Sequence, residues 1–182
     1  MQDHEVIERV KKGKADLFEI LVRRYEGKLF ALAWRMLHNR ADAEDAVQEA
    51  FVKAYRSLKR FRGEARFSTW LYRIALNHIL NRLRRGSRMR EADLDLERMP
   101  SILTPSYAAR QKELEVAVAR ATDQLPPRQC AIFHMRYEEE RPHAEIAEIL
   151  GISEGAVKAS YHHAVAKLRE SLKGFVTGSS RS

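Results

Sequence analysis

The sequence predicts an all-α protein made of two small helical domains joined by a flexible linker. Three observations favour this fold class. The chain of 182 residues is 45% hydrophobic, which is enough for a packed core. It contains only 8 Gly and 5 Pro, with few runs of β-branched residues. Its apolar residues recur at intervals of three and four, which is the spacing of one buried helix face.

The first predicted domain spans residues 1–86. A helix with apolar positions from Phe18 to Leu37 ends at a break formed by His38-Asn39-Arg40. The next helix begins with several acids, which are stabilising near a helix N-terminus. Gly63 then marks a loop. Ser68 or Thr69 is the expected N-cap of a further helix that starts near Trp70.

Residues 87–112 form the predicted linker, because periodicity fades there and two prolines interrupt a stretch of mixed charge. The second domain is expected over residues 113–174, followed by a frayed tail, 175–182. Its first helix begins near Lys112. Pro126-Pro127 breaks that helix, and Pro127 is suited to the first position of the next one.

A helix-turn-helix is predicted from His143 to about Leu172. Ala147 is small where two helices would cross closely, and Gly151 permits the positive φ of a tight turn. Val157 would enter the core from the second helix, and Ser153 is a natural N-cap for it. An ordinary hairpin of two helices is the alternative interpretation of this spacing.

The outward N-terminal face of that second helix would read a major groove, with a solvated helix face as the alternative for each residue. The candidate residues for this contact with DNA are Ser153, Glu154, Gly155, Lys158, Ala159, His162 and His163.

Positive charge is concentrated in one block of the chain. Residues 53–90 contain 12 Lys and Arg and one acid, Glu64, a local net charge of +11. The whole chain carries +8, so the rest carries a net charge of −3. A basic block within a mildly acidic chain indicates binding of a polyanion.

A polar stripe is expected on the helix within this block. Arg73, Asn77, Asn81 and Arg84 are spaced by four, four and three residues, so they share one helix face. An asparagine amide combines a donor and an acceptor, which suits the edge of an unpaired base. Aromatic residues just before the stripe are suited to base stacking. The alternatives are that Trp70 fills the core and that Asn77 satisfies a buried backbone group.

Catalytic and metal chemistry have no support in the sequence. It has no glycine-rich phosphate loop, no HExxH and no GxSxG, so we expect a protein that is not an enzyme and needs no cofactor. Cys130 and His134 share a helix face, but two ligands make an incomplete metal site, and Cys130 is expected to be a small core residue. No long apolar run or signal peptide is present, so we expect a cytoplasmic location without membrane insertion.

Two quoted segments carry a family resemblance. DAEDAVQEAFVKAYRSLKRFRGEARFSTWLYRIALNHILNRLRR resembles region 2 of bacterial sigma-70-family factors, and LPPRQCAIFHMRYEEERPHAEIAEILGISEGAVKASYHHAVAKLR resembles region 4. The absence of another recognisable region between them is typical of the short extracytoplasmic-function (ECF) group. The resemblance implies a transcription initiation factor that directs core RNA polymerase to promoters. It also implies an anti-sigma factor as a further partner, one that holds the protein at the membrane in some cases.

The resemblance implies roles for particular residues. The residues implied to bind core polymerase are Asp45, Gln48, Glu49 and Lys53, although an ordinary amphipathic helix also explains them. Those implied to bind melted minus-ten DNA are Arg62, Arg66, Phe67, Ser68, Thr69, Trp70, Arg73, Asn77, Asn81 and Arg84. The seven candidate residues of the helix-turn-helix are implied to read the minus-thirty-five element.

The chain departs from the usual family pattern at three places. Ala159 and Ser160 grip phosphate less well than the usual residues, His162 and His163 replace aromatic or basic ones, and Arg141-Pro142-His143 replaces a Ser-Tyr type of helix start. The main alternative function is a conventional helix-turn-helix regulator with a helical effector or dimerisation domain. That alternative does not explain the aromatic, Asn and Arg residues between 67 and 84, and a purely structural adaptor does not explain the +11 block.

Overall fold

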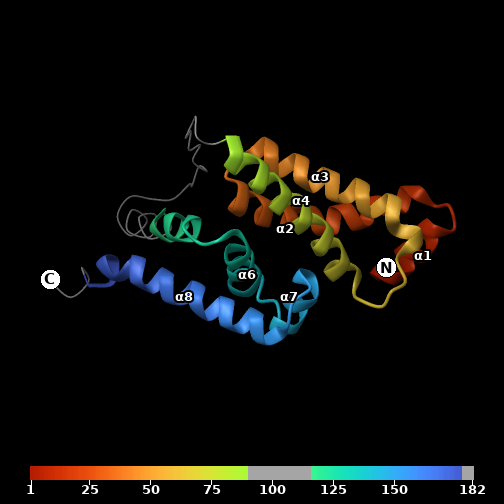
Figure 1. Cartoon of the computed structure of the whole chain (residues 1–182). Helices are drawn as coiled ribbons and strands as arrows, with labels where there is room; N and C mark the ends of the chain where they lie inside the picture. The colour runs from red at the N-terminus through yellow and green to blue at the C-terminus, as the bar shows by residue number, and fades with distance from the viewer. Residues whose placement is uncertain (90–115, 178–182) are drawn as a thin grey trace, which may run out of the picture.

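Two helical units, one from each end of the chain, lie side by side (Figure 1). The computed structural model describes residues 1–89 and 116–177, and within them the side chains of residues 1–86 and 116–173. The described residues contain α-helices and short 3-10 helices but no strand, which confirms the predicted all-α class.

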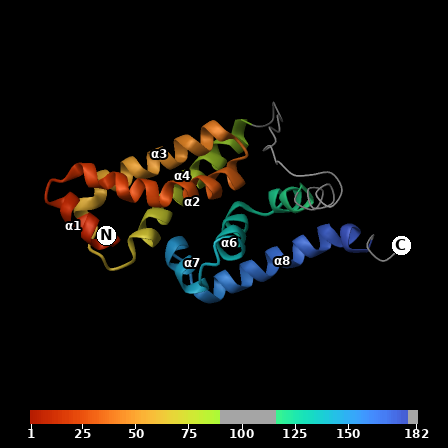
Figure 2. The same ribbon diagram turned by 180° about the vertical axis from the view of Figure 1, so that it is seen from behind.

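The N-terminal unit contains four α-helices, and two short 3-10 helices lie at Ala15–Leu17 and Leu58–Arg60. The four are α1 (Asp3–Lys11), α2 (Phe18–Leu37), α3 (Arg40–Ser57) and α4 (Phe67–Met89). Helices α2, α3 and α4 pack along one another with a shared apolar core (Figure 2). Helix α1 was not predicted, although Val6, Ile7 and Val10 give it a buried face.

Local sequence explains the predicted break between α2 and α3. His38 adopts a left-handed conformation with φ 53°, and its backbone ends α2. Asn39 is extended, and its side chain accepts a hydrogen bond of 2.9 Å from the Asp42 backbone N–H. An asparagine in this position satisfies one of the unpaired N–H groups at a helix start.

Both ends of α4 differ from the prediction. Helix α4 begins at Phe67, so Ser68 and Thr69 lie within its first turn and neither is its N-cap. Thr69 is instead buried, with 1% of its surface exposed. Helix α4 also continues to Met89, into the predicted linker. The remainder of that linker lies outside the described residues.

The C-terminal unit contains helical residues at 116–123, followed by three further helices. These are α6 (Pro127–Tyr137), α7 (His143–Leu150) and α8 (Glu154–Thr177). Pro127 is the first residue of α6, as predicted. Helix α8 extends through Thr177, so residues 175–177 of the predicted frayed tail are helical, and the rest of that tail lies outside the described residues.

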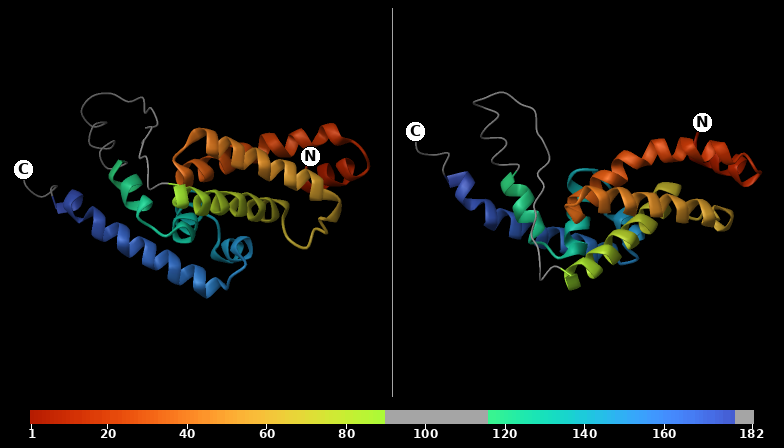
Figure 3. Two further views of the ribbon diagram at one scale, coloured as in Figure 1. Left: turned by 45° about the horizontal axis from the view of Figure 1, so that its top comes forward. Right: turned by 90° about the horizontal axis from the view of Figure 1, so that it is seen from above.

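Among the described residues, two pairs of helices make the main contacts between the units. Helix α6 lies against α2, and α7 lies against α4 (Figure 3). Helix α8 packs on α6 and α7 and runs along the outer edge of the C-terminal unit. At the start of the predicted polar stripe, Arg73 of α4 donates a hydrogen bond to the Glu148 backbone carbonyl of α7.

Candidate nucleic-acid and polymerase interfaces

The polar stripe predicted on α4 is present at the surface. Arg73, Asn77, Asn81 and Arg84 are all exposed and follow one another along the helix. Asn81 accepts a hydrogen bond from Arg84, which aligns these two side chains. The Asn77 amide makes no hydrogen bond to any residue that the structure describes. Its donor and acceptor are therefore both available in this arrangement.

The aromatic residues near the start of α4 form a cluster. Phe67 is 4% exposed and packs against Tyr25, Phe61 and Trp70, with ring centroids 5.8, 5.9 and 5.7 Å away. Trp70 is only partly buried, and its ring centroid lies 4.9 Å from that of Phe61. Phe67 has little surface left to stack on a base in this arrangement, whereas Trp70 retains some.

The loop before α4 is fixed to α1. The Lys11 ammonium donates a hydrogen bond of 2.9 Å to the Phe61 backbone carbonyl, and it lies 6.0 Å from the Phe61 ring centre. Tyr25 and Arg24 both donate to Asp3 at the start of α1. Burial and the Asp3 carboxylate raise the pKa of Tyr25 well above its usual value, so its hydroxyl remains a donor at neutral pH.

An open pocket of about 580 Å³ lies between α1 and this loop. Its lining includes Lys11, Tyr25, Arg62, Arg66 and Ser68. Arg62 and Arg66 are exposed, and the nearest acid to Arg62 is Glu64 at 3.9 Å. The arginines predicted to hold minus-ten DNA therefore surround a recess, whose opposite wall is the unpredicted helix α1. The sequence signal that predicts α1 is the capping box formed by Gln2 and Glu5 at its start.

The four residues predicted to bind polymerase share the exposed surface of α3. Two of them also face α4, because Asp45 and Glu49 lie 3.5 Å and 3.1 Å from Arg82. Glu49 further lies 3.1 Å from a ring nitrogen of His78. Gln48 and Lys53 are exposed beside them. The acidic part of this surface is therefore held in place by basic side chains of the neighbouring helix.

Arg82 belongs to the basic block of residues 53–90, but its charge is directed at acids of α3. It forms ion pairs with Asp42, Asp45 and Glu49, and 24% of its side chain is exposed. Sequence reasoning also missed Val52 and Tyr55, which are each 44% exposed on α3. Large apolar side chains at a charged surface are typical of protein interfaces.

The helix-turn-helix has the predicted local geometry. Gly151 has φ 66° and ends α7, where a side chain would be strained. The Ser153 hydroxyl accepts a hydrogen bond of 3.2 Å from the Ala156 N–H and caps α8. Val157 is fully buried and Ala147 is 8% exposed, so both enter the core as predicted.

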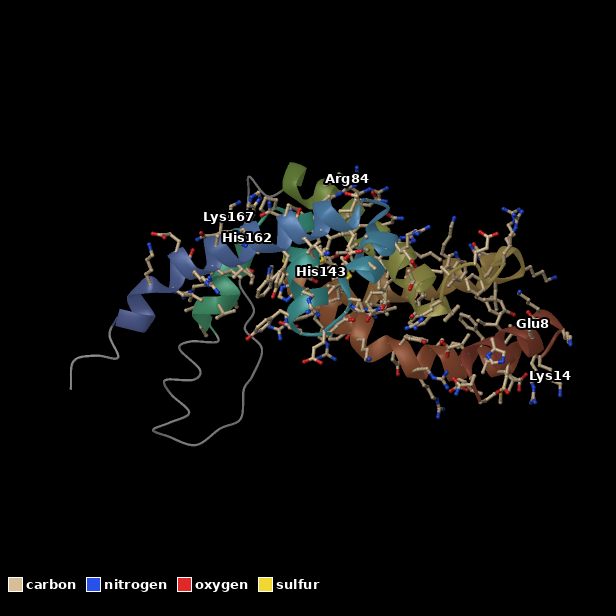
Figure 4. All side chains as sticks on the ribbon, turned by 90° about the horizontal axis from the view of Figure 1, so that it is seen from below. Glu8, Lys14, Arg84, His143, His162 and Lys167 are labelled. Carbon is tan, nitrogen blue, oxygen red and sulfur yellow. The ribbon has the colours of Figure 1, made fainter. Side chains whose placement is uncertain are left out.

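The predicted reading face of α8 is open to solvent. All seven of its candidate residues are exposed. Lys158 lies 2.8 Å from Glu154 one turn earlier, and its ammonium lowers the pKa of that carboxyl. His162 and Lys167 lie along α8, at the opposite end of the molecule from Glu8 and Lys14 (Figure 4). The basic and imidazole groups of α8 are thus available to a duplex.

Cys130 is a buried residue of α6, as expected. It is 6% exposed, and burial raises the pKa of its thiol to about 12. His134 is also buried and lies 3.1 Å from Glu138. These positions are consistent with packing roles for both residues.

Comparisons with known proteins identify the family of the chain. The family model described as Sigma-70 region 2 matches residues 21–89, and the one described as Sigma-70, region 4 matches residues 115–168. The chain is 35% identical over 168 residues to RNA polymerase sigma-H factor of Pseudomonas aeruginosa, which covers 87% of each chain. It is 33% identical over 177 residues to the ECF RNA polymerase sigma factor SigW of Bacillus subtilis, which covers 92% of this chain and 95% of SigW.

A solved structure has a similar fold. CnrH, in complex with the cytosolic domain of CnrY, superposes with a TM-score of 0.69 at 26% identity, over 94% of this chain and 97% of CnrH. No helix in the described ranges combines the length and the apolar character needed to span a bilayer. The chain therefore belongs to the sigma-70 family of RNA polymerase sigma factors, in its extracytoplasmic-function group, and is a transcription initiation factor that directs RNA polymerase to promoters.

Proposed function

We propose that the N-terminal unit contributes the polymerase contact and the capture of melted minus-ten DNA, and that α8 reads the minus-thirty-five element. One observation carries this proposal. A single chain combines an exposed Arg and Asn stripe on α4 with a capped helix-turn-helix whose outer face is open. A conventional regulator needs only the second of these features.

The polymerase contact is assigned to the outer face of α3. Asp45, Gln48, Glu49 and Lys53 supply its polar groups, and Val52 and Tyr55 add apolar surface. Interfaces of this kind combine apolar side chains with a surrounding polar rim. Arg82 keeps Asp45 and Glu49 oriented, because it pairs with both.

The minus-ten contact is assigned to the α4 stripe and to the recess beside it. Asn77 and Asn81 offer hydrogen-bonding groups to a base edge, while Arg62, Arg66 and Arg84 hold phosphates. Trp70 and Ser68 contribute at the edge of the recess. Phe67 and Thr69 act indirectly, because they are buried and position the loop and the start of α4.

The minus-thirty-five contact is assigned to the first turns of α8. Ser153 caps the helix, because its hydroxyl accepts a hydrogen bond from the Ala156 N–H. Glu154, Gly155, Lys158, Ala159, His162 and His163 form the surface that enters the groove. Lys158 must exchange its ion pair with Glu154 for a contact to DNA.

We further infer that the protein acts in the cytoplasm without catalysing a reaction, and that an anti-sigma factor regulates it. The supporting observation is that CnrH, which has a similar fold, was solved in complex with the cytosolic domain of CnrY. The proposed activity is tested by adding the purified chain to core RNA polymerase and sequencing the transcripts made from genomic DNA. Transcripts that share one pair of upstream elements are expected. Co-purification without new transcript starts would contradict the proposal.

A further inference from the structure

Helix α1 forms part of the recess although it lies outside the residues that match the region 2 family model, which begin at residue 21. It provides the wall opposite Arg62 and Arg66. Three of its apolar side chains are buried, so α1 is part of the core of the N-terminal unit. The shape of the recess therefore depends on an element that the matched family region does not include.

The end of α1 is bonded to the start of the loop that carries those arginines. We call this loop, residues 61–66, the recess loop. The Lys11 ammonium donates a hydrogen bond of 2.9 Å to the backbone carbonyl of Phe61, a residue 50 positions away. It also donates to the Glu8 carboxylate at 3.2 Å, which orients it. Glu8 lies at the end of the molecule away from α8 (Figure 4).

The recess loop has few backbone hydrogen bonds of its own. The Phe61 N–H donates to the Leu58 carbonyl at 3.1 Å, and the Arg66 carbonyl accepts from the Trp70 N–H at 3.1 Å. Between these two points, the N–H groups of residues 62–65 donate to no backbone group in the part of the chain that the structure describes. A segment with few internal bonds has low local stability, so the contacts at its two ends decide its conformation.

The other end of the recess loop is connected to α1 through Tyr25. The Tyr25 ring lies 5.8 Å from the ring of Phe67, which follows the loop and begins α4. The Tyr25 hydroxyl donates a hydrogen bond to Asp3 at the start of α1, and Arg24 donates to the same carboxylate. Both ends of the loop are thus connected to α1, one through Lys11 and the other through Tyr25.

We propose that α1 is the positioning element of the recess, and that Lys11 is a positioning residue for the capture of minus-ten DNA. This inference rests on the proposed function of the recess and of the α4 stripe. Phosphate contacts fix the register of a nucleic acid on a protein, although they do not read its bases. A recess loop that changes conformation moves Arg62 and Arg66, and the strand that they hold then shifts relative to Asn77. Base preference at the minus-ten element should fall as a result.

Four variants of the full-length protein test the proposal. Lys11→Met removes the ammonium and keeps an unbranched side chain, whereas Lys11→Arg keeps a charged donor. Lys12→Met is the matched control, because Lys12 is an exposed lysine at the next position and loses the same charge. Tyr25→Phe keeps the ring beside Phe67 but removes the hydroxyl that bonds to Asp3. Circular dichroism and a thermal melt check that each variant is folded.

Hydrogen exchange of the free protein, without DNA or polymerase, reports the conformation of the recess loop. The Phe61 amide should exchange about fivefold or more faster in Lys11→Met, because the loss of a bond from a charged donor lowers local stability. The Trp70 amide, which donates to Arg66, should exchange about threefold or more faster in Tyr25→Phe. Both amides should stay within twofold of the wild type in Lys11→Arg and Lys12→Met. Unchanged exchange in folded Lys11→Met overturns the proposal.

Transcription by the holoenzyme measures the consequence for DNA. Initiation is compared among promoters that differ by one minus-ten base, and discrimination is the ratio between the best and the worst base. Discrimination at one position should fall about threefold or more in Lys11→Met, return in Lys11→Arg and stay unchanged in Lys12→Met. If Lys11→Met instead lowers the salt slope of promoter binding by about one without faster loop exchange, Lys11 is itself a phosphate contact and the positioning role is overturned.

The wild-type protein separates failure of this inference from failure of the proposed function. If wild-type holoenzyme shows no base preference at any minus-ten position, the proposed function of the recess and the stripe is contradicted. If the wild type discriminates and folded Lys11→Met discriminates equally well, only the positioning role of Lys11 is contradicted.

Discussion

Arg82 of α4 lies within ion-pair distance of Glu49 of α3, at 3.1 Å, and this pair joins the two surfaces with different proposed partners. Glu49 belongs to the face assigned to polymerase, whereas α4 carries the stripe assigned to DNA. The same guanidinium also lies 2.9 Å from Asp42 and 3.5 Å from Asp45. A substitution of these acids changes the charge of the polymerase surface and also removes an ion pair that fixes α3 to α4. A control variant is therefore needed to separate the two effects.

Reversing two charges on α3 should weaken holoenzyme assembly. In Asp45→Lys with Glu49→Lys, the proposed polymerase surface changes sign, and we expect at least a tenfold loss of affinity for core polymerase in a pull-down titration. The matched control is Asp42→Lys with Glu44→Lys, which has the same charge change and also loses a partner of Arg82. Equal losses in both double variants would contradict the assignment.

The salt dependence of promoter binding should identify the phosphate contacts. The logarithm of affinity should fall with the logarithm of salt by about 0.7–0.9 per contacted phosphate. Arg84→Ala with Arg85→Ala should lower that slope by about one to two and weaken all promoter sequences alike. Arg23→Ala with Arg128→Ala removes the same charge from exposed positions elsewhere. A slope that changes equally in both double variants would indicate only a net-charge effect.

Asn77→Ala should alter base preference without altering the fold. The Asn77 side chain is exposed and makes no hydrogen bond to the described residues, so its removal should change the melting temperature little. Transcription should lose about 1–3 kcal/mol of discrimination at one minus-ten position, because a bidentate amide contact supplies that amount. Transcription from single-base promoter variants, beside a thermal melt, measures both effects. A lower melting temperature with unchanged preference would support a structural role instead.

Ser153→Ala should destabilise the helix-turn-helix. The Ser153 hydroxyl accepts from the Ala156 N–H, and loss of an N-cap costs about 0.5–2 kcal/mol. Ser171→Ala, an exposed serine within the same helix, should change the free energy of unfolding by less than about 0.5 kcal/mol. Urea unfolding followed by circular dichroism compares the two. Equal stabilities would show that this cap does not stabilise α8.

Cys130 should make stability fall as pH rises above 9. Burial raises the pKa of its thiol from an ordinary value of 9.0 to about 12, so above pH 9 the folded state holds a proton that the unfolded state loses. Stability should therefore decrease between pH 9 and 12, by at most about 1.4 kcal/mol per pH unit. The difference in unfolding free energy between wild type and Cys130→Ala, measured from pH 8 to 10, isolates this contribution. A pH-independent difference would contradict it.

Local sequence determined where several helices begin and end and which face of α4 is polar. The left-handed Gly151, the Ser153 cap, the Pro127 start of α6 and the exposed stripe from Arg73 to Arg84 all follow from neighbouring residues. Each depends on backbone geometry within one or two helical turns, which spacing and residue type specify directly. Two-part organisation was equally visible, because two quoted segments resemble two regions of one family.

Tertiary structure alone decided which of these residues are accessible and what they touch. Phe67 and Arg82 have the residue types of a DNA contact, yet the first is buried in an aromatic cluster and the second pairs with three acids of α3. The contact of Arg141 with Tyr72 joins residues 69 positions apart. Burial and ion pairing between distant segments depend on how helices pack, and a periodic pattern specifies which face of a helix is apolar but not which helix covers it.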